Sequence, residues 1–113
     1  MKQTITEKFL DSIWDFAGRP ADDRIKDQVK NCVIDYLACT MLGAHLAKEE
    51  NRGYLESFSD SSGNIPVVGA GIRTGVLQAA MLNGMNSHLI ELDDGNRYAM
   101  LHLGAPVISA MLV

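Results

Sequence analysis

The residue types that could do chemistry gather in one stretch of the chain, residues 79–105. This stretch holds two of the three histidines, three acidic residues within four positions, and one arginine. An Asn-Gly step precedes the acidic residues and a Gly-Ala-Pro step follows them. The polar residues of interest are His88, His102, Glu91, Asp93, Asp94, Arg97, Asn96 and Asn83. If this chain has a chemical function, we expect it to reside here.

Histidine near crowded carboxylates is a typical arrangement for general acid–base catalysis. Carboxylates that lie close together resist ionising side by side, and an imidazole beside them exchanges a proton near neutral pH. Such groups suit removal of a proton α to a carboxylate, with loss or replacement of a group on the neighbouring carbon. His102 and the Asp93–Asp94 pair are our candidates for this acid–base chemistry.

Two other interpretations of the same cluster stay open. His88, His102 and the three carboxylates are all competent metal ligands, but the sequence contains no H-E-x-x-H or similar ligand spacing. The cluster is also compatible with a purely structural role, as a polar loop between helices with caps and surface ion pairs, and spacing alone favours this role over a metal site. Spacing alone does not decide among these three.

Two helices are expected to position the cluster. We predict a helix that is capped by Thr74 and ends near Leu92. Gly84, His88 and Glu91 have the spacing i, i+4, i+7 and would share one of its faces. The sequence Asp94–Gly95–Asn96 indicates a turn in which glycine adopts a positive φ. Pro106 would be the first residue of the next helix, so a loop of about ten residues would carry most of the local polarity.

Upstream, the patterns predict three further helices. Thr4 and Glu7 have capping-box spacing, and Gly18 with Pro20 would end that first helix. The second helix would begin near Ala21 and end at a left-handed Gly43. Its apolar stripe is formed by Ile25, Val29, Cys32, Val33, Tyr36, Leu37, Thr40 and Met41. A third, more polar helix would cover residues 47–58.

A glycine- and serine-rich break, residues 59–71, follows these helices. Residues 65–68 read as a short extended segment that Pro66 keeps out of a central strand. Gly69, Gly71 and Gly75 lack the G-x-G-x-x-G spacing and the lysine of nucleotide-binding loops, so they do not indicate a nucleotide site.

Composition limits the class of protein. The 113 residues suffice for one modest core, and the formal net charge is −4 with ten unclustered basic residues, which argues against a nucleic-acid partner. No apolar run reaches the roughly 18 residues of a membrane span, and the cytoplasm is the expected location. Cys32 and Cys39 would lie about 10.5 Å apart along a helix, too far for a disulfide.

The last residues, Ile108 to Val113, form an apolar run without a stop signal. We interpret the chain as the front part of a longer protein, or as one that covers this run with a partner.

Two segments together resemble a known family. LNGMNSHLIELDD, followed by HLGAPVISA, is similar to the N-terminal signature of the MmgE/PrpD family. This family includes 2-methylcitrate dehydratases and cis-aconitate decarboxylases. The segment VIDYLAC, followed by LGA, resembles the family's first long helix and its glycine stop. The similarity covers nearly the whole chain.

The resemblance implies an all-α fold of about five helices, residues 1–113 being the front of the family's helical domain. It implies homodimers, a small polycarboxylate substrate, and neither a metal nor an organic cofactor. By position, the implied catalytic residues are His102, Asp93, Asp94 and Glu91, and the implied substrate-binding residues are His88, Arg97, Asn96 and Asn83.

The chain departs from the family pattern at a few positions. Leu103 stands where proline is usual, and Gly95 and Asn96 replace residues found in some decarboxylases, which disfavours decarboxylation. Arg97 is the only fixed cation in the loop, whereas a site for anions needs several. We therefore expect part of a lyase or epimerase site that does not turn over alone. The rival hypothesis is a non-catalytic helical module that self-associates or pairs with a longer relative.

Overall fold

The computed structural model describes residues 2–58 and 62–113, except for the side chains of Leu55 and Phe58. Over this part of the chain, five helices and one two-stranded hairpin are present, and the structure is 59% helical. The predicted all-α class is therefore confirmed. Residues 59–61, which belong to the predicted loop, and the side chains of Leu55 and Phe58 lie outside the described part.

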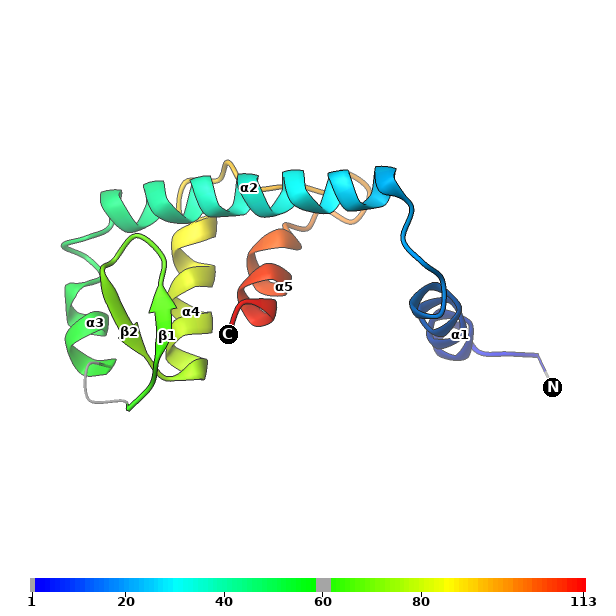
Figure 1. Cartoon of the computed structure of the whole chain (residues 1–113), viewed down its shortest axis with the longest axis horizontal. Helices are drawn as coiled ribbons and strands as arrows, with labels where there is room; N and C mark the ends of the chain where they lie inside the picture. Colours follow the sequence, from blue (N-terminus) through cyan, green and yellow to red (C-terminus); the bar gives the residue numbers. More distant parts are fainter. Residues whose placement is uncertain (1, 59–61) are drawn as a thin grey trace.

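Helix α1, Ile5–Ala17, begins and ends as the sequence predicts. The Thr4 hydroxyl accepts from the backbone N–H of Glu7, and the Glu7 carboxylate accepts from the backbone N–H of Thr4 at 2.7 Å. Gly18 caps the other end. None of the residues of α1 is buried, and the helix lies beyond the N-terminal end of α2, away from the rest of the molecule (Figure 1).

Helix α2, Asp23–Leu46, is the longest element and crosses the C-terminal end of α4 (Figure 1). Only the second half of its apolar stripe is buried, around Tyr36, Cys39 and Thr40. Our prediction that Gly43 ends the helix with a positive φ is wrong, because the helix continues to Leu46. Gly43 is needed for close packing instead: a Cβ at this position would lie 1.9 Å from the carbonyl oxygen of Asn86 on α4.

The third helix is shorter than predicted, and one strand was missed. Helix α3 covers Arg52–Phe58, after a series of turns. Strand β1, Ile65–Val67, pairs antiparallel with β2, Ile72–Thr74, in the register Ile65 with Thr74. The turn between them uses the positive φ angles of Gly69 and Gly71. A three-residue strand that follows a glycine-rich turn is too short to give a clear alternation in the sequence.

Helices α4, Val76–His88, and α5, Gly104–Met111, lie side by side, and both pack against α2 (Figure 1). Three boundary predictions are wrong here. Thr74 ends β2, and Gly75 occupies the N-cap of α4 without a side-chain hydrogen bond. Helix α4 ends at His88 rather than near Leu92, and α5 begins two residues before Pro106.

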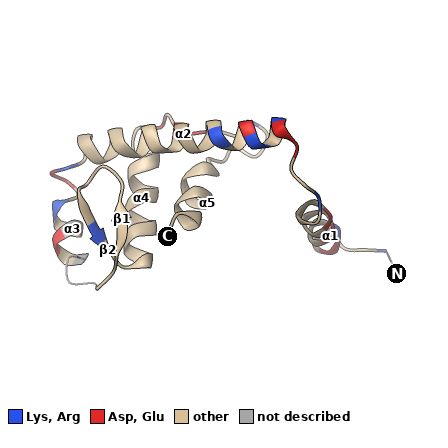
Figure 2. Ribbon diagram, in the orientation of Figure 1, with Lys and Arg blue, Asp and Glu red and all other residues tan. Residues whose placement is uncertain are grey.

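Charge is unevenly distributed over these elements. Figure 2 shows charged residues on α1 and along the first half of α2, whereas α4 and α5 contain no Asp, Glu, Lys or Arg. Among the described residues, no helix has the length and apolar character required to span a membrane.

Candidate functional site

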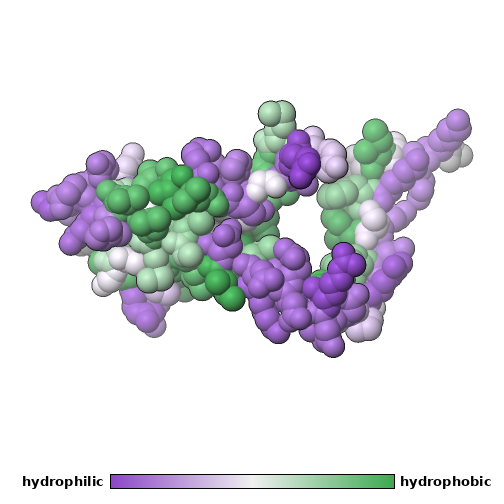
Figure 3. All heavy atoms as spheres, turned by 90° about the horizontal axis from the view of Figure 1, so that it is seen from above, coloured by the Kyte–Doolittle hydropathy of each residue, from purple (hydrophilic) through white to green (hydrophobic). Residues whose placement is uncertain are grey.

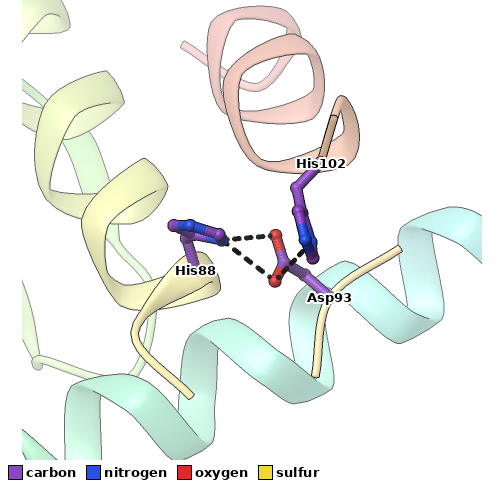
Figure 4. A group of neighbouring side chains, drawn as sticks. All are labelled: His88, Asp93 and His102. Atoms are coloured by element: carbon purple, nitrogen blue, oxygen red, sulfur yellow. Dashed lines mark hydrogen bonds and ion pairs between the residues drawn. The ribbon is translucent and has the colours of Figure 1, made fainter. Parts of the chain in front are cut away.

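Two histidines converge on one buried carboxylate (Figure 4). Nδ1 of His88 lies 3.1 Å from each carboxylate oxygen of Asp93, and Nδ1 of His102 lies 3.3 Å from Asp93 Oδ1. The Asp93 side chain is 2% exposed, whereas those of His88 and His102 are 46% and 36% exposed. The imidazole rings meet edge to face, with centroids 4.9 Å apart. The carboxylate of Asp93 is therefore buried between the two more exposed imidazole rings.

The elements of the fold bring these residues together from three places. His88 is the last residue of α4, Asp93 lies in the connecting loop, and His102 comes two residues before α5. The loop turns back on itself where the backbone N–H of Asn96 donates to the carbonyl of Leu101. The Asn96 side chain supports this turn by accepting from two backbone N–H groups, so its role in the structure is local.

The contact geometry assigns the proton on His88. An ionised carboxylate only accepts hydrogen bonds, so Nδ1 of His88 carries the hydrogen and Nε2 is left with its lone pair or a second proton. Nδ1 of His102 is buried. It lies 3.3 Å from Asp93 Oδ1, but the geometry is not that of a hydrogen bond, so this nitrogen has no hydrogen-bond partner in the described chain. A small rotation of this imidazole would let it donate to the same carboxylate.

Asp94, the neighbour of Asp93, caps a helix. Its Oδ1 accepts from the backbone N–H of Gly104 at 2.7 Å, at the start of α5. A Cβ on Gly104 would lie 2.1 Å from this oxygen, so glycine is required for the contact. We predicted that Asp93 and Asp94 act as a pair, but Asp93 contacts the imidazoles and Asp94 contacts the first backbone N–H of α5.

The other predicted site residues are dispersed. Oε1 of Glu91 lies 3.4 Å from Nε2 of His88, at the open side of the cluster. Asn83 is buried and ties α4 to the hairpin, because its side chain accepts from Val68 N–H and donates to the Pro66 carbonyl. Arg97 is exposed and makes no hydrogen bond or ion pair with any residue that the structure describes.

The predicted turn is built differently from our expectation. The positive φ angles lie at Glu91 and Met100, both 52°, and Gly95 does not have one. Positive φ is uncommon for non-glycine residues. Both residues flank the cluster in the chain, so the backbone on either side of Asp93 is the strained part of the loop.

A broad hollow of about 920 Å³ opens beside the histidines, between α4 and α5. Its ionisable lining consists of His88, His102 and Glu91, and Asp93 is not part of it. The remainder is mostly apolar and was not predicted as part of a site. It is formed by Ala80, Met81, Gly84, Met85, Leu89, Met100, Leu101, Ala105, Pro106, Ser109 and Ala110. The signal that could have shown it is the i, i+3, i+4, i+7 spacing of Met81, Gly84, Met85 and His88.

The same three side chains have the donor types of a metal site with two histidines and one carboxylate. Their candidate ligand atoms lie within 4.8 Å of one another. Both carboxylate oxygens of Asp93 already lie in hydrogen-bonding contact with His88. The expected absence of a metal remains a prediction.

The fold and the site place this chain in a class of helical domains. The sequence matches the MmgE/PrpD N-terminal domain over residues 9–113, and the chain belongs to this family. The resemblance on which we based the site prediction is thereby confirmed.

Two similar proteins come from filamentous fungi. The chain is 30% identical over 92 residues to the "cis-aconitate decarboxylase-like protein oryM" of Aspergillus oryzae, and 29% identical over 92 residues to a "cis-aconitate decarboxylase" of Aspergillus terreus. Each match covers 81% of this chain but only 19% and 18% of the respective relatives. The chain thus spans about a fifth of their length. None of the solved structures that were compared matches it.

Proposed function

We propose that this chain supplies part of the active site of a lyase or epimerase that acts on small polycarboxylates by removing a proton α to a carboxylate. The convergence of His88 and His102 on Asp93, with both rings bordering the hollow, is the observation that carries the proposal. Family membership and the decarboxylase names of the two relatives support a lyase. Decarboxylation is also a lyase reaction, but it breaks a C–C bond with loss of CO2 and does not begin with removal of an α proton, so the chemistry proposed for this chain differs from it.

In this proposal the three residues have different tasks. Asp93 is a positioning residue, because it is buried beneath the rings and absent from the lining of the hollow. By accepting from Nδ1–H of His88, it leaves Nε2 of that ring available to take a proton, and a rotation of His102 would place its Nδ1–H in the same contact. His102 would be the base, and His88 beside Glu91 would help to hold or return the proton. In this proposal a positioning role therefore replaces the direct acid–base role that we predicted for Asp93.

The chain alone is expected to bind substrate weakly and not to turn it over. Neither Lys nor Arg lines the hollow, although a polycarboxylate needs several cationic partners. The hollow is also broad and open, whereas a reaction that generates a carbanion needs a site from which water is excluded. Complete activity would require further polypeptide around this face. We also retain as proposals a cytoplasmic location and the absence of any cofactor.

Binding can be tested by NMR on the imidazole resonances of the 113-residue chain. Titration with cis-aconitate or 2-methylcitrate is expected to shift the signals of His88 and His102 at millimolar concentrations. His45, on the exposed side of α2, is the internal control and should not shift. Equal shifts at all three histidines, or none, would contradict the proposal, and measurable conversion of either acid would contradict the inactivity of the isolated chain.

A second candidate function is favoured by one observation, the exposed apolar lining of the hollow. A non-catalytic module that self-associates through this face would show no imidazole response to carboxylates but would associate with increasing concentration. The two functions are therefore separable in the same sample.

A further inference from the structure

A second cavity lies at the end of the molecule where α2 leads into α3 (Figure 1). It has a volume of about 290 Å³ and lies among the last turn of α2, the turns that follow it, the glycine turn of the hairpin and one residue of α4. It shares no lining residue with the hollow beside the histidine cluster. The two cavities therefore differ in place and in composition.

Two buried amides belong to the lining of this second cavity. Asn51 and Asn86 are 8% and 2% exposed, and Nδ2 of Asn51 donates to Oδ1 of Asn86 at 2.7 Å. In the described part of the chain, Asn86 Nδ2 and Asn51 Oδ1 make no hydrogen bond. Neither atom is fully enclosed, because the enclosed and unpaired side-chain atom among these residues is Nδ1 of His102. Buried amides are normally hydrogen-bonded, so a donor and an acceptor that open into a cavity indicate a polar ligand.

The charge of the lining favours an anion. His45 and Lys48 are exposed at the rim, three positions apart in the chain, and Lys48 forms no ion pair with any residue that the structure describes. Among the described residues, neither Asp nor Glu lines the cavity. Figure 3 shows hydrophilic residues at this end of the molecule, on the left of the view. The cavity thus combines a cation, an imidazole and a buried N–H donor.

We propose that this cavity binds a small phosphate monoester whose carbon skeleton carries a hydroxyl group. Lys48 and the side-chain N–H of Asn86 would donate to the phosphate oxygens, and Oδ1 of Asn51 would accept from the hydroxyl group. The volume exceeds that of a single phosphate ion, so it leaves room for the carbon skeleton. This inference goes beyond the proposed function, because it concerns a different cavity and uses no residue of the histidine cluster.

The distribution of charge separates this ligand from the polycarboxylates proposed for the hollow. A phosphate monoester carries about −1.5 to −2 charges at pH 7 on one group, which a single cation can serve. A tricarboxylate spreads its charge over several groups, and the exposed Glu49 and Glu50 beside Lys48 would repel those that Lys48 does not reach. Polycarboxylates should therefore leave His45 unchanged. The carbonyl groups at the end of α2 also oppose an anion, so we expect a dissociation constant in the millimolar range.

NMR titration of the whole chain with glycerol 3-phosphate, at constant pH and ionic strength, tests the proposal. The imidazole of His45 and the side-chain NH2 of Asn86 should shift together, with a single dissociation constant. The signals of the histidine cluster should not move. The side-chain NH2 of Asn83 is the control for the amide, because it already donates to the Pro66 carbonyl and should also stay in place.

A pair of lysine variants tests the cation. Lys48→Gln should raise the dissociation constant at least about fivefold, because one charge-assisted hydrogen bond is lost. Lys30→Gln removes the same charge from an exposed position of α2 outside the cavity, so it should leave the constant unchanged. Both lysines are exposed, and neither substitution should affect folding.

Inorganic phosphate tests the recognition of the carbon skeleton. It should shift the same signals with weaker affinity, because it brings no carbon-bound hydroxyl group to Asn51. Several results would overturn the proposal: no shift at His45 and Asn86, equal shifts at the histidine cluster, unchanged affinity in Lys48→Gln, or inorganic phosphate that binds as tightly as the ester. None of these results would bear on the proposed function, since the two cavities share no residue.

Discussion

At the scale of single residues, the site depends on which carboxylate is buried. The sequence shows three acids in four positions, but the structure uses them differently: Asp93 lies beneath the imidazoles, Asp94 caps α5, and Glu91 stays at the open side. That histidines and carboxylates would gather in this stretch was predictable from the sequence, and acid–base chemistry stays a prediction. The division of roles was not, because it depends on the positive φ of Glu91, which no local pattern indicates.

Asp93→Asn tests the role of this carboxylate. The variant loses the charged group that accepts from Nδ1 of His88 and lies near Nδ1 of His102. The side-chain NH2 of asparagine would instead face an imidazole N–H, donor against donor. We expect the free energy of unfolding to fall by about 1–3 kcal/mol, the usual cost of a lost buried partner. Urea denaturation measures it, and ¹⁵N shifts of His88 should show a loss of preference for hydrogen on Nδ1. Asp35→Asn, at an exposed position on α2, is the control and should change stability by less than about 0.5 kcal/mol.

The two cysteines should differ in reactivity. Burial raises the pKa of the Cys39 thiol, and the nearby carboxylates of Asp35 and Asp93 raise it further. Because the thiolate is the reacting form, iodoacetamide at pH 8 should alkylate Cys39 at least about tenfold more slowly than the half-buried Cys32. Mass spectrometry of peptides from a time course gives both rates, and in denaturant they should converge. Equal rates in the folded protein would contradict the burial of Cys39.

At the scale of elements, the sequence predicted the helices better than their ends. Capping residues identified α1 correctly, because Thr4 and Glu7 act locally. The end of α2 was wrong because Gly43 serves a tertiary contact with α4, and a single sequence does not distinguish a glycine that ends a helix from one that lets two helices approach. The second strand of the hairpin, β2, was missed for a similar reason, since it exists only through its pairing with β1.

Gly43→Ala tests the crossing of α2 and α4. The added methyl group would lie 1.9 Å from a backbone oxygen, which no side-chain movement relieves, so the helices must separate. We expect a loss of at least about 2 kcal/mol in unfolding free energy. Gly53→Ala in α3 is the matched control, because nothing lies within 4 Å of its added Cβ, and it should be neutral or stabilising by up to about 1 kcal/mol. Similar losses in both variants would show that the close approach is not what matters at Gly43.

The cap of α1 makes its helicity depend on pH. Hydrogen bonds from the backbone and side chain of Thr4 lower the pKa of Glu7 from its ordinary value of 4.5. A carboxylate with a lowered pKa stabilises the folded form above its ordinary pKa, and the contribution is lost as the pH falls through the lowered value. Helix content in α1 should therefore decrease as the pH falls below about 4.5, as measured by backbone chemical shifts of residues 5–9. In Glu7→Gln this step should be absent. An identical titration in both proteins would contradict the role of the cap.

At the scale of the whole molecule, the shape is too extended for a self-contained domain. The radius of gyration is 16.8 Å, and the dimensions are 53 × 26 × 26 Å. A compact domain of this length would have a radius of gyration of about 13 Å. The difference arises because α1 lies apart from the body and the hollow between α4 and α5 is open. Sequence reasoning found the unprotected apolar run near the end of the chain, but it could not foresee that no residue of α1 would be buried in the part of the chain that the structure describes.

If copies associate through the exposed apolar lining of the hollow, as the second candidate function requires, stability must depend on protein concentration. Association of folded copies removes them from the unfolding equilibrium, so the melting temperature should rise by about 3–6 °C over a hundredfold increase in concentration. Met85→Asp, in that lining, should show no concentration dependence, whereas Leu77→Asp, on α4 outside the lining and 80% exposed, should behave as the unmodified protein does. Differential scanning calorimetry or fluorescence at several concentrations measures both. A Met85→Asp variant that keeps the concentration dependence of the unmodified chain would place the contact elsewhere.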